Sequence, residues 1–138
     1  KKGNQYPFII IDKRYQKIIG STCFLDIQMQ HKKLEIGATW LQPDYWGSSI
    51  NVECKLLLLN YCFDELGATR VQLKTDEKNI RSRKAIEKIG AEFEGILRNE
   101  MIRDNNTKRN SAFYSIIDNE WNHKKLQLIE LLKKYQNG

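Results

Sequence analysis

Hydrophobic and polar positions alternate along residues 34–41, which is the pattern of a strand whose two faces meet different surroundings. One face of this strand carries Leu34, Ile36, Ala38 and Trp40. Pro43 cannot donate to a sheet ladder, and a small-residue turn after it precedes a longer apolar run. The pattern therefore predicts that the strand stops before Pro43 and that a helix covers residues 48–66, where Gly67 ends it.

The remaining patterns predict a mixed sheet with two further helices. Apolar alternation indicates strands at residues 6–11, 17–27, 69–75, 92–102 and 108–117. The first strands have short polar links and should be antiparallel, whereas the strand after the long helix completes a parallel βαβ unit. Helices are predicted over residues 80–89 and from Asp118 onward. The order is therefore β-β-β-α-β-α-β-β-α, an α/β (α+β) fold in a single domain over residues 1–138.

The start of the long helix is a candidate anion site. The first turn of a helix presents unpaired N–H groups and the positive end of the helix dipole. Gly47, Ser48 and Ser49 would let a phosphate approach these amides, and the two hydroxyls could add hydrogen bonds. Serine is also a common N-cap, so the same residues suit an ordinary helix start, and the loop alone is a weak motif.

Composition narrows the class of partner. A net charge of +6 and a pI near 9.2 favour anionic ligands, which include nucleic acids, phosphate-bearing cofactors and acidic proteins. Nucleic acid is the least favoured of these, because the basic residues lack the interleaved aromatic platform that binds single strands. The sequence contains no apolar run near the roughly 18 residues of a membrane span and no recognisable signal peptide. We therefore expect a cytoplasmic protein with no membrane partner.

Cysteine and histidine usage indicates neither a disulfide framework nor a metal site. The three cysteines are odd in number and form no CxxC pair, and those in the apolar helix should be buried and inert. The two histidines have no metal-ligand spacing. We therefore expect no metal cofactor.

Several spaced motifs, in the order of the predicted elements, resemble the GNAT superfamily of acetyl-CoA-dependent N-acetyltransferases. The motifs are EIGATWLQPDYWGSSINVE, DELGATRVQLKTDEKNIRSRKAIEKIGA, EGILR and YSIIDNEW. Within the superfamily they are similar to the ribosomal-protein N-terminal acetyltransferases, the RimJ/RimL-like branch. The resemblance covers nearly the whole chain and implies a GNAT-like mixed sheet, acetyl-CoA as co-substrate and an amine acceptor, either a protein N-terminus or a small molecule.

The resemblance also implies a set of cofactor contacts. The family's phosphate loop, Q/R-x-x-G-x-G/A, falls on residues 44–49, where Gly47 is kept while Asp44 and Ser49 depart from the pattern. A carboxylate near a pyrophosphate is repulsive unless it points away, so Asp44 is the less favourable departure. The strands on either side of the long helix should splay apart and expose backbone groups to pantetheine. The implied contacts are Ala38, Thr39, Trp40, Leu41, Trp46, Gly47, Ser48, Ser49, Ile50, Asn79 and Ser82. Asn79 is in addition predicted to cap the next helix.

The reaction implied by the resemblance is attack of a neutral amine on a thioester, which needs a base, an oxyanion donor and an acid for the thiolate. Backbone N–H groups of residues 34–41 are the natural oxyanion donors. Many relatives use a Tyr as the acid, but this chain has Ile86 at the matching position, so Ser82 becomes the candidate. Glu35 is the candidate base, although it could equally be an ordinary solvated carboxylate. The alternatives are Glu94, Glu100, His31 and a water relay.

Family members usually carry a further strand and two helices before the strand predicted at residue 6, and those helices wall the acceptor site. The sequence given does not include them. We therefore expect either that the start of the chain was removed or is not shown, or that a naturally shortened chain completes its site with another subunit. An exposed sheet edge would favour a homodimer. The alternative function is a catalytically weak module that binds CoA or dimerises.

Overall fold

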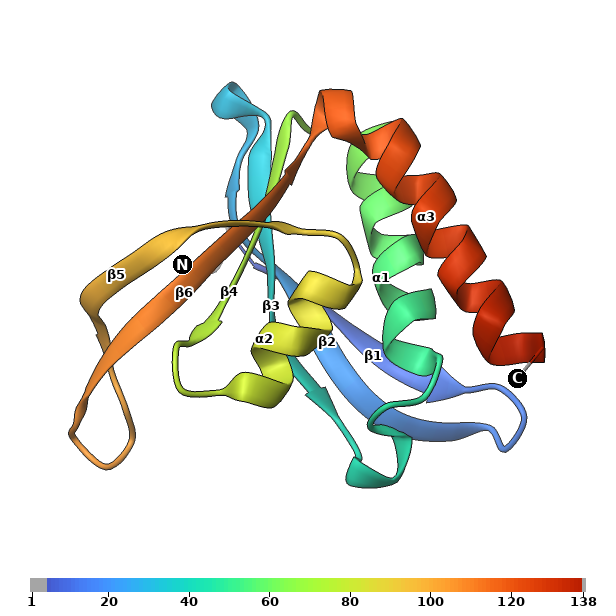
Figure 1. Ribbon diagram of the computed structural model, residues 1–138, viewed down its shortest axis with the longest axis horizontal. Helices are drawn as coiled ribbons and strands as arrows, with labels where there is room; N and C mark the ends of the chain where they lie inside the picture. Colours follow the sequence, from blue (N-terminus) through green and yellow to red (C-terminus); the bar gives the residue numbers. More distant parts are fainter. Residues whose placement is uncertain (1–4, 138) are drawn as a thin grey trace.

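The computed structural model describes residues 5–137 and places six strands in one sheet, in the order β1-β2-β3-β4-β6-β5 (Figure 1). The elements are β1 (Tyr6–Asp12), β2 (Lys17–Gln28), β3 (Lys33–Leu41), α1 (Ile50–Asn60), β4 (Arg70–Asp76), α2 (Ile80–Lys88), β5 (Glu92–Ile102), β6 (Lys108–Ile117) and α3 (Asp118–Asn137). Short helical turns lie at Met29–His31, Pro43–Tyr45 and Tyr61–Glu65. The predicted order of strands and helices is confirmed.

The long helix differs from its predicted bounds at both ends. The α-helix begins at Ile50, two residues later than predicted, and gives way after Asn60 to a π-helical turn at Tyr61–Glu65. Gly67 follows with a φ of +69°, a conformation that glycine adopts without the strain of a side chain. The predicted stop at this glycine is therefore confirmed, whereas the regular α-helix is shorter than the apolar pattern suggested.

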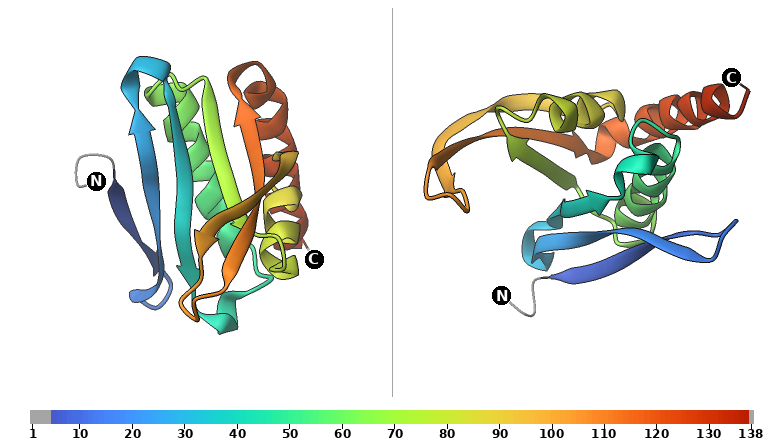
Figure 2. Two further views of the ribbon diagram at one scale, coloured as in Figure 1. Left: turned by 90° about the vertical axis from the view of Figure 1, so that its left-hand side faces the viewer. Right: turned by 90° about the horizontal axis from the view of Figure 1, so that it is seen from below.

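Strands β1, β2 and β3 form an antiparallel meander, as predicted. The predicted parallel pairing of β3 with β4 is present but short, because it consists of Lys33↔Arg70, Leu34↔Val71 and Glu35↔Gln72. Beyond these pairs β3 continues to Leu41 and β4 continues to Asp76 without registering against each other. We call the gap between residues 36–41 of β3 and residues 73–76 of β4 the fork. Figure 2 shows the two arms of the sheet diverging on either side of it.

One hydrophobic core joins the three helices to one face of the sheet. The helices contribute Val52, Leu59, Cys62, Ile86, Ile89, Trp121 and Leu128. The sheet contributes alternate residues of its strands, among them Leu34, Ile36, Val71, Leu73, Tyr114 and Ile116. Helices α1 and α3 lie side by side over this face (Figures 1 and 2). The fork therefore opens next to the helices on one side of the sheet.

The opposite side of the fork is polar. Side chains of β4 that point away from the core form ion pairs with β5, from Arg70 to Glu94 and from Lys74 to Glu100, each with a 2.8 Å contact. We call this surface the polar face and define it by Glu35, Arg70, Gln72, Lys74, Glu94 and Glu100. Two chemically different surfaces thus meet at the fork.

Candidate functional site

Strand β3 contains a bulge where it enters the fork. Between Gly37 and Trp40, three steps along β3 oppose two steps along β2, so β3 holds one extra residue. Ala38 accommodates this extra residue with a φ of +51°, in the left-handed region that residues with a Cβ seldom adopt. The alternation predicted along residues 34–41 is therefore wrong beyond Gly37, and the Trp40 side chain is 54% exposed instead of lying on the buried face.

Strand β2 supports the bulge closely. The hydroxyl oxygens of Thr22 and Thr39 lie 2.8 Å apart. A Cβ at Gly20 would lie 2.2 Å from the Trp40 carbonyl oxygen, so only glycine lets the two backbones approach this far. On its other edge, β3 has no registered β4 partner beyond Glu35. The backbone of residues 38–41, implied above as a pantetheine contact, thus lies on an unpaired strand edge that is held in shape by β2.

The loop between β3 and α1 is ordered by its own hydrogen bonds. The Ser48 hydroxyl donates to the Tyr45 carbonyl oxygen at 2.6 Å and accepts from the Ile50 N–H at 3.3 Å. Gly47 has a φ of +75°, and a Cβ there would meet no atom within 4 Å. The side chain of Ser49 makes no capping hydrogen bond to α1. The Ser48 hydroxyl is therefore already engaged with the loop backbone, and Gly47 and Ser49 leave the helix start open to a ligand.

A buried carboxylate fixes this loop to the first hairpin. Asp12 at the end of β1 accepts a hydrogen bond of 2.7 Å from the Tyr45 hydroxyl and two from the Arg14 guanidinium. The hydrogen bonds from Arg14 and Tyr45 lower the pKa of Asp12 to about 2. The carboxylate is consequently ionised at neutral pH, and it holds the turn before α1 against β1.

The start of α2 lies at the end of the other arm of the fork. Asn79 accepts a hydrogen bond of 3.0 Å from the Ser82 N–H, so its predicted role as N-cap is confirmed. Ser82 is half-buried in the first turn of this helix. Ile86, which stands where many relatives have a Tyr, is 8% exposed and belongs to the core. Because β3 leads into α1 and β4 leads into α2, both helix starts face the end of the sheet at which the fork opens (Figure 1).

Trp46 and Arg81 connect the two arms, which the sequence did not indicate. The indole N–H of Trp46 donates to the Leu41 carbonyl oxygen at 2.8 Å. The guanidinium carbon of Arg81 lies 3.7 Å from the centre of the Trp46 ring. The carbonyl of Leu41 is thus already occupied, whereas the loop before α1 and the first turn of α2 are in direct contact across the fork.

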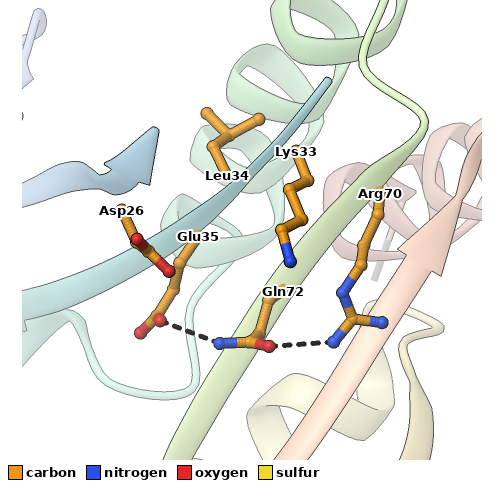
Figure 3. A pocket seen from close by; sticks show the side chains of 6 residues that line it. All are labelled: Asp26, Lys33, Leu34, Glu35, Arg70 and Gln72. Carbon is orange, nitrogen blue, oxygen red and sulfur yellow. Dashed lines mark hydrogen bonds between the residues drawn. The ribbon is translucent and has the colours of Figure 1, made fainter. Parts of the chain in front are cut away.

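Glu35 lies at the base of the fork on the polar face. It is 6% exposed and accepts a hydrogen bond of 3.0 Å from the Gln72 amide (Figure 3). Gln72 in turn accepts from Arg70 at 2.8 Å. Burial raises the pKa of Glu35, and the hydrogen bond from Gln72 offsets this effect only in part. The interpretation of Glu35 as a solvated strand carboxylate is therefore wrong, because the side chain is buried and perturbed as a general base often is.

The other candidate bases, Glu94, Glu100 and His31, are less well suited to accept a proton at the fork. Hydrogen bonds from Arg70 and Ser115 lower the pKa of Glu94. Burial alone would raise the pKa of Glu100, but hydrogen bonds from Lys74 and Ser111 lower it. His31 lies in the turn before β3, at the end of that strand opposite to the fork. Of the three carboxylates, Glu35 is therefore the one whose pKa is raised.

A buried lysine on α1 was also missed from the sequence. Lys55 is 6% exposed and occupies the helix stripe that also buries Val52 and Leu59. Its ammonium donates to the Asn51 side-chain oxygen at 3.1 Å. Burial lowers the pKa of Lys55 to about 8. An apolar helix with a single lysine gives no sequence signal that distinguishes this residue from a solvated one.

The described residues contain no cluster of three or more His, Cys, Asp or Glu side chains that could hold a metal ion. All three cysteines are free thiols. Within residues 5–137, none of the helices combines the length and the apolar character that crossing a membrane requires. What the site does offer is an unpaired strand edge, an open loop before α1 and a buried carboxylate, which suits an extended anionic ligand and a proton transfer.

The sequence is similar to those of known proteins. The profile of the family described as Acetyltransferase (GNAT) domain matches residues 1–92 of the chain. The chain is 30% identical over 97 residues to the uncharacterised N-acetyltransferase p20 of Bacillus licheniformis, which covers 70% of this chain and 54% of p20. It is 29% identical over 110 residues to YdaF of Bacillus subtilis (strain 168), provisionally named a ribosomal N-acetyltransferase, with 77% of this chain and 59% of YdaF covered.

Structural comparison leads to the same group of proteins. The crystal structure of a GCN5-related N-acetyltransferase from Brucella melitensis matches with a TM-score of 0.89 and 30% sequence identity. The match covers 94% of this chain and 58% of the Brucella protein. The chain thus spans a little over half the length of each of these three relatives.

Proposed function

The chain belongs to the GNAT acetyltransferase family, and from this membership we propose that it transfers the acetyl group of acetyl-CoA to a primary amine by direct attack of the amine on the thioester. The acceptor is a protein N-terminus or a small-molecule amine. The provisional name of YdaF makes a ribosomal protein N-terminus one reasonable acceptor to test.

The fork supports this proposal most directly. The edge of β3 at residues 38–41 has no strand partner and can pair with the amides of pantetheine. The first turn of α1, beside Gly47, would offer N–H groups other than that of Ile50, which the Ser48 hydroxyl already accepts, and these suit the pyrophosphate. When bound, acetyl-CoA would supply an activated acyl group, and the backbone N–H groups at the bulge around Ala38 would stabilise the developing oxyanion.

The two proposed acid–base residues lie on opposite sides of the fork. Glu35 on the polar face would accept the proton of the attacking amine, because its burial keeps it more basic than an ordinary glutamate. Ser82 in the first turn of α2 would donate a proton to the departing thiolate. A thiol is already a tolerable leaving group, so the contribution of Ser82 should be smaller than that of Glu35.

The acceptor would approach from the polar face, because α1 and α2 occupy the other side of the fork. We further propose that a second copy of the chain pairs with β1, the edge strand of the sheet, on which Tyr6, Ile9 and Ile11 are exposed. Three free thiols suit a reducing compartment, and we propose a cytoplasmic location.

The proposal is tested by calorimetric titration of the chain with acetyl-CoA and by thiol release with a panel of primary amines. Asn79→Ala and Gly47→Val probe the two helix starts, and Arg98→Gln is a control at an exposed residue of β5. Binding that both site variants weaken, together with turnover of one amine class, would support an acetyltransferase. Binding without turnover by any amine would favour the module that only binds CoA. Absence of binding by a folded sample would contradict the acetyltransferase and favour the module that dimerises.

A further inference from the structure

Arg81 and Trp46 form a close cation–π contact. The guanidinium carbon of Arg81 lies over the Trp46 ring, 3.7 Å from the ring centre. The guanidinium is therefore in van der Waals contact with the face of the indole.

The indole is itself held in place. Its N–H donates to the Leu41 carbonyl oxygen at 2.8 Å, which ties the ring to the last residue of β3. Arg81 is thereby fixed over the loop that precedes α1, although its own backbone belongs to the first turn of α2. The long side chain loses rotamer freedom before any ligand arrives, so binding would not have to supply that ordering free energy.

The donors of Arg81 are left without a partner. Across the part of the chain that the structure describes, no hydrogen bond or ion pair links its guanidinium to a protein acceptor, whereas Arg14, Arg70, Arg83 and Arg103 all have such acceptors. A stacked guanidinium keeps its full charge and can present two parallel N–H groups to the oxygens of a phosphate. The loop beneath it contains Asp44, whose negative charge makes a nearby cation more necessary for an anionic ligand.

We propose that Arg81, held by Trp46, is a phosphate-binding residue of the cofactor site and fixes the nucleotide end of acetyl-CoA across the fork. This inference rests on the proposed function, because it assigns a contact to the same cofactor. The phosphate is either the pyrophosphate or the ribose 3′-phosphate, which offer the same chemistry to a guanidinium. Trp46 is the positioning residue, and it acts through Arg81.

The experiment measures dissociation constants and kcat/KM for three donors with wild type, Arg81→Gln and Trp46→Leu. The donors are acetyl-CoA, acetyl-dephospho-CoA, which lacks the 3′-phosphate, and acetyl-pantetheine, which lacks all phosphates. Arg81→Gln should weaken acetyl-CoA roughly tenfold, as expected for loss of a charge-assisted hydrogen bond. Trp46→Leu should weaken it by a smaller factor, and Arg98→Gln, which removes the same charge from β5, should leave it unchanged.

The donor series separates the possible outcomes. If Arg81→Gln also weakens the binding of acetyl-dephospho-CoA, Arg81 contacts the pyrophosphate. If it weakens the binding of acetyl-CoA but not that of acetyl-dephospho-CoA, Arg81 contacts the 3′-phosphate. The proposal is overturned if Arg81→Gln leaves the affinity for acetyl-CoA unchanged. It is also overturned if the variant weakens acetyl-pantetheine, which has no phosphate, as much as it weakens acetyl-CoA. If wild type itself binds no acetyl-CoA, the proposed function fails, whereas binding by wild type and Arg81→Gln alike refutes only the role of Arg81.

Discussion

Glu35 and Gln72 form the last registered pair of β3 and β4, and their side chains are joined by a hydrogen bond of 3.0 Å. One residue further along, the two strands separate. A buried carboxylate with a raised pKa therefore lies at the vertex of the fork.

Glu35→Gln should lower kcat/KM for the best amine on the order of a hundredfold, because it keeps the size and hydrogen bonding of the side chain but removes the base. Affinity for acetyl-CoA should not change, since Glu35 lies on the polar face, from which we propose that the acceptor approaches. Steady-state rates and calorimetric titration check both statements. Glu92→Gln, at an exposed glutamate of β5, is the matched control, and equal rates for the two variants would show that Glu35 is not the base.

Gln72→Leu should move the acid limb of the pH–rate profile to higher pH. Burial raises the pKa of Glu35 and the hydrogen bond from Gln72 lowers it, so the pKa should rise further when this hydrogen bond is lost. A base with a higher pKa is ionised only at higher pH, which shifts the rise in rate in that direction. The profile of Glu35→Gln shows which limb belongs to this carboxyl, and a limb that moves to lower pH would contradict the assignment.

Lys55 should make the chain more stable as the pH rises from about 8 to 10.5. Its pKa is about 8 in the folded state and 10.5 ordinarily, so over this range the unfolded chain binds the proton that the folded chain has released. The linked gain in the free energy of unfolding is on the order of 3 kcal/mol. Urea unfolding at pH 7 and pH 10 measures it.

Lys55→Met should raise the urea midpoint at pH 7 and flatten this pH dependence, because a buried charge is replaced by an apolar chain of similar length. Lys84→Met on α2, where the lysine is exposed, is the control. A steep pH dependence that survives in Lys55→Met would assign it to another group.

Asp12 should contribute stability that is lost in acid. Its folded pKa of about 2 lies below the ordinary value of 3.8, so the contribution is complete above the ordinary pKa and disappears as the pH falls toward 2. Tyr45→Phe removes one of the hydrogen bonds that lower this pKa and should shift acid unfolding to higher pH. Circular dichroism across pH 5 to 1.5 measures the shift, and Tyr15→Phe, at an exposed tyrosine of the same hairpin, should leave it unchanged.

The strands and helices could be predicted from the sequence, because apolar alternation, the glycines that end helices and the helix cap at Asn79 depend only on residues close in sequence. They could not predict the bulge, because Ala38 takes its positive φ in response to β2, and Gly20 permits the close contact from far away in sequence. The stack of Arg81 on Trp46 and the burial of Lys55 likewise depend on tertiary packing. Glu35 was identified by its place on a strand, but its burial depends on the neighbouring strands.

The two sides of the fork can change independently during evolution. In the proposed function, donor recognition would depend on the helix starts and the edge of β3, whereas the acceptor would meet β4, β5 and the outward residues of β6. Substitutions on the polar face, such as at Lys74 or Glu100, can therefore alter the choice of amine without disturbing the residues that would hold the cofactor. A lineage built on this sheet can acquire new substrates through changes on one side while its donor site stays under constant selection.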